Sequence, residues 1–405
     1  MSQVRMPHIV YVCAAPVYGG AEEYLIGLAE NVRRADWRVS ALLPQRPGFA
    51  GAVARLEAAG VGVATGPIKT SEDYPWPTLL HLADVPQRAW LERTLRAYAP
   101  DVVHINQPNT EGGQLVLAAA ARLAGVPVVT TVHAYDSIGA LGYRLGRLRD
   151  AIVDWHYRRV RAISVPAPTA ARVLQQAYRH TRGKASVVGP AIDAARFAPA
   201  RAAVGAAAWR ARLAPDGATR LVGVVGRLSP EKGQVALVRA WPRIVAAAPG
   251  ARLVLAGEGP ARGAIEALCQ AAGISDSVVL LGGVAHDDVP ALLGALDVVV
   301  LPSRYECLPL AILEAMAVGR PVVAYAINAI PDAIAHEESG LLVTPGDDVA
   351  LAAAILRILR DPALARCLGQ CARQVIETRF TAAVQTHQIL DLYQRVLCAP
   401  EGTHQ

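Results

Sequence analysis

Apolar runs rich in β-branched residues alternate with helix-forming stretches along most of the chain, and this alternation is the strongest constraint on its fold. Strands that follow one another with a helix between them pair in parallel, because a parallel pair needs a long crossover connection. The pattern therefore predicts an α/β protein with doubly wound, Rossmann-like parallel sheets, covered by helices on both faces. The expected strands cover 8–14, 37–43, 61–64, 102–105, 126–132, 220–226, 252–256, 277–281 and 297–301, and the expected helices 21–33, 50–59, 79–98, 113–124, 233–248, 261–273, 288–295 and 382–397.

The alternation breaks once, in a segment rich in proline and alanine near the middle of the chain. A chain of 405 residues is long enough for two domains, each with its own core. We therefore expect an N-terminal domain over 1–190, a linker over 191–218 and a C-terminal domain over 219–379.

The composition excludes several classes of protein. With 53% hydrophobic and 18% charged residues the chain is globular, and no apolar run reaches the roughly 18 residues that span a bilayer. Residues 1–7 lack the apolar core of a signal peptide, so a cytoplasmic location is expected. The six cysteines are scattered without metal-ligand spacing, so we expect reduced thiols and no metal. No nucleic-acid partner is expected.

The net charge of +6 comes from the first half of the chain, where residues 139–184 hold ten basic residues and two acidic ones. Two interpretations remain open. The stretch is either an ordinary solvated face or an arginine-rich surface that lies on anionic lipid headgroups, with Trp155 and Tyr157 at the interface. The second interpretation predicts a peripheral position on the inner face of a membrane.

Two glutamates mark a turn from strand to helix in residues 297–317. Asp297 to Leu301 is typical of a buried strand, and the helix follows from Leu308. Glu306 lies in the turn and Glu314 in the helix, at the carboxyl end of a parallel strand, where such sheets bind ligands. A solvated position is the alternative for each, but Glu314 follows an apolar run and would need a partner if buried.

A second loop carries two cations. Arg227 and Lys232 lie between the first strand of the second half and the helix after it, in a loop that begins at Gly226. Two cations beside a helix N-terminus suit a diphosphate and can neutralise a leaving group without a metal. The alternative is that they pair with Glu231 or other surface acids.

The first half has weaker signals of the same kind. Gly19 and Gly20 follow the first strand and precede a helix, where a backbone can approach an anionic ligand closely. His133 follows a strand that ends at Val132. A plain turn and a structural histidine are the alternatives.

In this order the motifs resemble those of the retaining family 4 glycosyltransferases (glycosyl transferases group 1), enzymes of the GT-B fold with two Rossmann-like domains and a cleft between them. The resemblance covers residues 8 to about 346. The motifs that carry it are Gly19 to Glu22, Pro100 to His104, Thr131 to His133, Gly189 to Asp193, Gly226 to Gly233, Ala256 to Pro260, Glu306 to Glu314 and Ser339 to Val343.

The resemblance implies a role for each candidate residue. Arg227 and Lys232 would grip the donor diphosphate, Glu306 would bind the hydroxyls of the transferred sugar, and Glu314 those of the ribose. The final helix, 380–405, would join the first domain. The remaining implied donor contacts are Gly226, the amides around Cys307 and Leu308, the region from Gly282 to Val284 beside the base, and Gly20 and His133 from the first domain.

Two departures from the family pattern affect these roles. The family turn is often Glu-Gly-Phe-Gly, whereas here it is Glu306-Cys307-Leu308-Pro309, and Pro309 has no N–H to donate. Pro190-Ala191 replaces a common Asn-Gly.

The resemblance implies transfer of a sugar, with retention and without a cofactor or metal, from a nucleotide-diphospho-sugar (a UDP-sugar is favoured) to a hydroxyl group. A carbohydrate or lipid-linked acceptor in cell-envelope polysaccharide or glycolipid assembly is expected. The alternatives are a soluble natural product as acceptor, a nucleotide-sugar epimerase or hydrolase of the same fold, and a non-catalytic binding protein.

Overall fold

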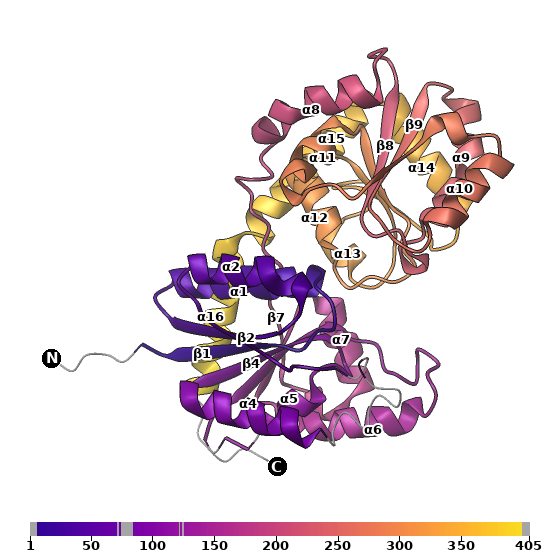
Figure 1. Ribbon diagram of the computed structural model, residues 1–405. Coiled ribbons are helices and arrows are strands. Elements are labelled where there is room, and N and C mark those ends of the chain that lie inside the picture. Colours follow the sequence, from indigo (N-terminus) through magenta and orange to yellow (C-terminus); the bar gives the residue numbers. More distant parts are fainter. Residues whose placement is uncertain (1–5, 71–72, 74–83, 121, 124, 399–405) are drawn as a thin grey trace. The chain divides into compact units, whose positions relative to one another are not determined.

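The computed structural model describes residues 6–70, 73, 84–120, 122–123 and 125–398 (Figure 1). It divides into two compact units, of which unit 1 comprises Met1–Ala191 with Ala382–Gln405 and unit 2 comprises Ile192–Thr381. Each unit is a parallel sheet with helices against it, so the predicted pair of doubly wound α/β domains is confirmed. Among the described residues, no helix combines the length and the apolar character needed to cross a membrane.

Unit 1 has a seven-stranded sheet in the order β3-β2-β1-β4-β5-β6-β7. All its neighbouring strands run parallel, as with Ile9 beside Val39 of β2 and Val102 of β4. The strands β6 and β7 were not predicted, because they have only four and three residues and lie in or beside the basic stretch. The strands are β1 His8–Cys13, β2 Arg38–Pro44, β3 Gly62–Gly66, β4 Val102–Asn109, β5 Val128–Ala134, β6 Ala162–Val165 and β7 Ala185–Val187.

Helices cover both faces of this sheet (Figure 1). The expected helix over 79–98 is described from Val85, and residues 79–83 lie outside the described residues. Tyr157, which the lipid interpretation placed at the surface, is fully buried, because it lies on the inner side of α6 against Tyr178. The helices are α1 Gly20–Arg34, α2 Ala50–Ala58, α4 Val85–Tyr98, α5 Gln114–Ala120, α6 Gly146–Tyr157 and α7 Pro168–Ala177, with 3-10 turns at Pro47–Phe49 and Arg179–Thr181.

The last helix, α16 (Ala382–Cys398), belongs to unit 1. Its Ile389, Leu392 and Tyr393 are buried in the same cluster as α1 and β1. The Tyr393 hydroxyl lies 2.8 Å from that of Tyr11 and 2.6 Å from His104 Nδ1. The structure thus places the C-terminal segment on the first unit through both apolar packing and buried hydrogen bonds.

Unit 2 has a six-stranded parallel sheet in the order β10-β9-β8-β11-β12-β13. Its first strand, β8, lies in the middle, so the order of winding reverses between β8 and β11. A doubly wound sheet binds ligands at the carboxyl ends of the strands beside such a reversal. The strands are β8 Arg220–Val225, β9 Ala251–Ala256, β10 Val278–Gly282, β11 Val298–Leu301, β12 Val322–Tyr325 and β13 Leu341–Val343.

Residues 192–218, within the segment 191–218 expected to be a linker, group with unit 2, and Ala191 with unit 1. It contains helix α8 (Pro199–Leu213), which packs on α11 (Val289–Ala295) with Gly205 and Gly294 at the close contacts. Proline suits the first turn of a helix and alanine is the best helix former, so a composition that breaks the strand pattern here builds a helix. The other helices of unit 2 are α9 Gln234–Ala247, α10 Arg262–Ala271, α12 Leu310–Ala317, α13 Ile330–Ala333, α14 Asp348–Arg360 and α15 Pro362–Arg379, with 3-10 turns at Pro230–Lys232, Ser275–Ser277 and His286–Asp288.

Candidate active site

Two loops meet at the carboxyl edge of the unit 2 sheet, where the winding reverses. One follows β8 (226–233) and the other follows β11 (302–309). Gly233 has φ +70°, and a Cβ atom there would lie 1.8 Å from the carbonyl oxygen of Pro302. The backbone of Arg304 also donates to the carbonyl of Glu231 at 2.8 Å. Glycine at 233 therefore allows the two loops to pack directly against each other.

Lys232 and Glu306 form an ion pair across these loops. The distance between Lys232 Nζ and Glu306 Oε1 is 2.6 Å, and the Ser303 hydroxyl donates to the same oxygen at 2.8 Å. The Glu306 side chain is almost fully buried, while Lys232 is about one quarter exposed. The pair joins residues that are 74 positions apart in the sequence. A carboxylate with two donors on one oxygen keeps its other oxygen for a further hydrogen bond.

Arg227 lies in the same loop with a different partner. Its guanidinium pairs with Glu231 at 2.6 Å and is 65% exposed, which agrees with the alternative that a surface acid binds it. An exposed pair of this kind contributes little to stability, so its geometry can change when an anion binds. Gln234, buried in the first turn of α9, donates to the carbonyl of Arg227 at 2.8 Å and fixes the backbone from which the arginine extends.

The turn that carries Glu306 is held by an amide side chain. Asn328 Nδ2 donates to the Glu306 carbonyl at 2.7 Å. Within the turn, Leu308 is buried and Cys307 is half-buried. Pro309 has an extended backbone and precedes the first residue of α12. Glu314 lies on this helix and is half-buried.

Three glycines line the adjacent strand ends. The first two, Gly226 and Gly257, directly follow β8 and β9, and the third, Gly282, is the last residue of β10. All three have positive φ. A Cβ atom at Gly257 would lie 2.0 Å from the Gly226 carbonyl oxygen, and the Gly257 amide donates to Gly282 at 2.8 Å. The strand ends therefore approach one another as closely as backbones can. Val284 follows two residues after Gly282 and is half-buried.

In unit 1, Asn106 connects the predicted site residue His133 to the start of α1, where the other predicted residue, Gly20, lies. His133 Nε2 lies 2.8 Å from Asn106 Oδ1, and Asn106 Nδ2 donates at 3.2 Å to the carbonyl of Ala21, which follows Gly20 at the start of α1. Because the Asn106 amide nitrogen already donates, its oxygen accepts, so the proton of the imidazole is on Nε2 and the lone pair on Nδ1. The Tyr24 ring packs edge-on against the imidazole, with centroids 5.0 Å apart.

Burial controls the charge of this histidine. Loss of hydration lowers the pKa of His133 from 6.5 to about 3, and burial likewise lowers the pKa of His104 to about 3, with a smaller contribution from His133. Both imidazoles are therefore neutral at neutral pH. His133 is a hydrogen-bonding group there and a weak base.

Sequence reasoning missed several residues that this geometry brings in. Asn106 and Asn328 have a common signal, since each is a polar residue that follows an apolar run of a strand toward its carboxyl end, where ligands bind. Asn106 lies within β4, and Asn328 follows β12. Ser303 follows the strand β11 in the same way. Gly257 belongs to the Ala256 to Pro260 motif, although it was not given a role.

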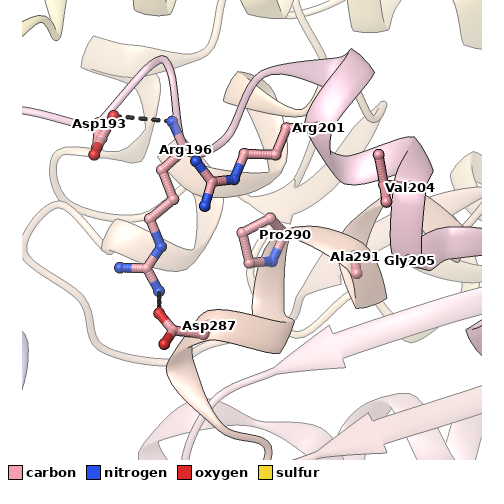
Figure 2. A pocket seen from close by; sticks show the side chains of 8 residues that line it. All are labelled: Asp193, Arg196, Arg201, Val204, Gly205, Asp287, Pro290 and Ala291. Carbon is pink, nitrogen blue, oxygen red and sulfur yellow. Dashed lines mark hydrogen bonds and ion pairs between the residues drawn. The ribbon is translucent and has the colours of Figure 1, made fainter.

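A surface hollow in unit 2 is separate from these residues. Figure 2 shows it between the start of α8 and α11, and its lining includes none of the predicted site residues. Arg196 crosses it to reach Asp287 at 3.2 Å and the His286 carbonyl at 2.6 Å. The lining residues are Asp193, Arg196, Arg201, Val204, Gly205, Asp287, Pro290 and Ala291.

The described residues contain no cluster of three or more His, Cys, Asp or Glu side chains arranged to hold a metal ion. The charged groups at the carboxyl edge of unit 2 are instead paired cations and acids.

Comparison with known protein families matches both halves of the chain. Residues 18–196 match the family model described as Glycosyltransferase Family 4, and residues 206–375 match that described as glycosyl transferases group 1. The 2-deoxystreptamine glucosyltransferase of Streptomyces kanamyceticus is 30% identical over 322 residues, which cover 76% of this chain and 83% of that relative.

Solved structures share the same fold. The sucrose-phosphate synthase of Thermosynechococcus elongatus is 25% identical, with a TM-score of 0.80, and the match covers 98% of this chain and 100% of that one. HepE of Anabaena, solved in complex with UDP-glucose, is 23% identical with a TM-score of 0.76, and the match covers 96% and 99% of the two chains.

Proposed function

Because the chain belongs to the glycosyl transferases group 1 of the GT-B fold, and is therefore a glycosyltransferase, we propose that it moves a sugar from a UDP-sugar to an acceptor hydroxyl with retention of configuration. The observation that carries the proposal is the ion pair of Lys232 with the buried Glu306 at the reversal of the unit 2 sheet. A cation and a carboxylate at such a reversal suit a diphosphate and sugar hydroxyls, respectively, and this supports the proposal.

The reaction that we propose is a substitution on one face of the sugar. The bond from the anomeric carbon to the diphosphate breaks, the acceptor oxygen forms its bond on the same face, and a diphosphate oxygen takes the acceptor proton. Negative charge develops on the leaving diphosphate, so cations beside it stabilise the transition state more than the bound donor. We assign this task to Lys232 and Arg227.

The other donor contacts follow the same plan. Glu306 would bind sugar hydroxyls and Glu314 the ribose hydroxyls. The close backbones at Gly226 and Gly282, with Val284, would border the nucleotide. Cys307 and Leu308 would contact the sugar or phosphate through their amides. Gly20 and His133 would contribute from unit 1, and the low pKa of His133 favours a hydrogen-bonding role for it over that of a base.

We propose that no metal ion or other cofactor takes part, since two cations are available for the diphosphate. Addition of EDTA should leave the transfer rate unchanged, and a rate restored only by added Mg²⁺ or Mn²⁺ would contradict the proposal. The uridine nucleotide is supported by HepE, which was solved with UDP-glucose.

For the acceptor, we propose a carbohydrate or lipid-linked molecule of cell-envelope polysaccharide or glycolipid assembly, with the enzyme at an anionic membrane surface through residues 139–184. A soluble natural product is the second candidate, because the relative from Streptomyces kanamyceticus is a 2-deoxystreptamine glucosyltransferase. Parallel assays with a lipid-linked saccharide and with 2-deoxystreptamine separate the two.

The test of the donor is a thermal-shift panel with UDP-, GDP-, ADP- and dTDP-sugars, followed by transfer assays and determination of the product anomer by NMR. We expect stabilisation by a UDP-sugar and a product with the anomeric configuration of the donor. An inverted product would contradict retention. Release of free UDP or of an epimerised donor without acceptor would favour a hydrolase or an epimerase, and donor binding with no turnover across a broad acceptor panel would favour a binding protein.

A further inference from the structure

Unit 1 presents a group of exposed apolar side chains at one place on its surface. All seven residues from Gly139 to Leu145 are exposed, and they include Leu141, Tyr143 and Leu145, each at least half exposed. Leu148 and Trp155 on the adjoining helix α6 are 53% and 47% exposed. We call these five side chains the apolar surface. Figure 1 shows α6 and the loop before it at the outer edge of unit 1. Large apolar side chains that are exposed together within so short a segment, residues 141–155, are typical of a surface of interaction.

Hydrogen bonds and close packing hold both ends of the loop 139–145, which carries three of these side chains. Asp150 on α6 accepts hydrogen bonds from the amides of Ile138 and Gly139 at 2.8 and 2.9 Å, and from the Tyr178 hydroxyl at 2.7 Å. Gly146, the first residue of α6, packs so closely that a Cβ atom there would lie 2.6 Å from the Cα of Gly139. The apolar side chains therefore extend from an ordered turn.

Leu145 adopts a backbone conformation that is costly for its residue type. Its φ and ψ are 56° and 24°, in the left-handed region that favours glycine, asparagine or aspartate. At 57% exposure, the Leu145 side chain gains only part of the burial that could offset this backbone cost. Contact of its side chain with an apolar partner would account for it.

Basic residues alternate with the apolar surface along this part of the sequence. Arg147, Arg158 and Arg159 are exposed, and among the described residues no acidic side chain forms an ion pair with any of them. The Arg159 guanidinium stacks over the Trp155 ring at 3.8 Å. The two acids of the stretch are already engaged, Asp150 with the loop and Asp154 with Arg179 and His180 at 3.2 and 2.9 Å.

We propose that the apolar surface inserts into the headgroup region of an anionic lipid bilayer, with the flanking arginines on the lipid phosphates. Leucine side chains gain by leaving water, an amphipathic tryptophan suits the interface, and each arginine gains from the negative surface potential. Two other partners fit the surface less well. A second copy of this chain would bring the arginines of both copies together, and a nucleic acid has no apolar phase into which the leucines could insert. The inference deepens the proposed membrane position and rests on it, whereas the transfer reaction does not depend on it.

The experiment measures sedimentation of the full chain with vesicles of equal parts phosphatidylglycerol and phosphatidylcholine, against vesicles of phosphatidylcholine alone. We expect binding to the anionic vesicles at low salt and weaker binding as salt rises. Brominated lipids should quench part of the tryptophan fluorescence, and Trp155→Phe should remove that quenching.

Paired variants separate insertion from simple adsorption. Leu145→Ser with Leu148→Ser should lower partitioning about a hundredfold, since each leucine contributes about tenfold. Val204→Ser with Val349→Ser removes two apolar side chains of unit 2 that are at least as exposed as the two leucines, and it should leave partitioning unchanged. Arg147→Gln with Arg158→Gln should weaken binding and its salt dependence, while Arg239→Gln with Arg243→Gln should not.

The outcomes are distinguishable. Absence of binding even at low salt overturns both the insertion and the proposed membrane position. Binding that the arginine pair abolishes and the leucine pair leaves intact overturns insertion and keeps only electrostatic adsorption. A concentration-dependent dimer that the leucine pair dissolves would assign the surface to a second copy. In each case a soluble acceptor, assayed without vesicles, reports the transfer reaction separately.

Discussion

Both units have a parallel sheet, but the side chains at the carboxyl edges of the two sheets differ in chemistry. In unit 2 the loops after β8 and β11 carry cations and acids in pairs, Lys232 with Glu306 and Arg227 with Glu231. In unit 1 the corresponding edge holds neutral polar groups, His133 and Asn106, buried and joined to each other. A parallel sheet thus determines which edge is suited to a ligand, and the side chains at and beside its strand ends determine whether that edge is charged or neutral.

The largest effect that we expect is a loss of stability at acidic pH, and it tests whether the buried histidines of unit 1 are neutral. Burial holds the pKa of His104 and His133 at about 3, whereas both titrate near 6.5 when the chain is unfolded. Below pH 6.5 the unfolded state binds more protons, so the free energy of unfolding falls as the pH drops from 6.5 toward 3. At pH 5 the loss is about 2 kcal/mol for each histidine, or about 4 kcal/mol for both.

Chemical denaturation at pH 7 and pH 5 measures this loss. His104→Gln and His133→Gln should each reduce the difference between the two pH values. A difference that neither substitution changes would assign the acid sensitivity to other groups.

Removing one cation from the carboxyl edge of unit 2 tests most directly whether its charge is needed for catalysis. We expect Lys232→Ala or Arg227→Ala to lower kcat by about a hundredfold or more, because charge develops on the diphosphate in the transition state. Lys69→Ala, which removes an exposed lysine paired with Asp84, is the matched control with unchanged kcat. A normal rate in either variant would overturn its assignment.

A double variant separates catalysis from folding. Lys232→Ala leaves the buried Glu306 carboxylate without its cation, which costs stability. Adding Glu306→Gln should restore stability in thermal unfolding, while the loss of kcat remains. Recovery of kcat in the double variant would mean that Lys232 acts only through the fold.

The packing of the two unit 2 loops gives a smaller effect on stability. Gly233→Ala places a Cβ atom against the Pro302 carbonyl and forces alanine to a positive φ, so we expect a loss of about 2 kcal/mol in the free energy of unfolding. Gly263→Ala is the control, because Gly263 is exposed on α10 with open space around it and the change should stabilise slightly. Equal effects of both substitutions would show that the loops do not need their close contact.

The smallest effect concerns the role of His133. His133→Gln keeps a side-chain donor for Asn106, and we expect kcat/KM to fall about tenfold or less, the size of one altered hydrogen bond. Since His133 is neutral above pH 6, the pH dependence of kcat between pH 6 and 8 should match that of the unchanged protein. Loss of an acid limb near pH 7 in the variant would identify His133 as a base after all.

Much of the architecture could be predicted because it follows from local pattern. The strand and helix alternation gave the two parallel sheets, and the motifs gave the family, both of which are confirmed. The failures have local causes. The strands β6, β7, β12 and β13, which were not predicted, have only three or four residues, so their periodicity is weak. The alanine-rich segment around α8 was interpreted by its lack of strands rather than by its helix propensity.

The sequence by itself determined that Arg227, Lys232, Glu306 and Glu314 follow or adjoin the carboxyl ends of strands, because strand and helix periodicity fixes where each strand ends. Only the tertiary structure decided the partners. Lys232 pairs with Glu306 because β8 and β11 are neighbours in the sheet, and Asn106 joins His133 to the start of α1 because β4 lies between β1 and β5. Side-chain pairing depends on distances of a few ångströms between distant segments, and strand order alone sets those distances.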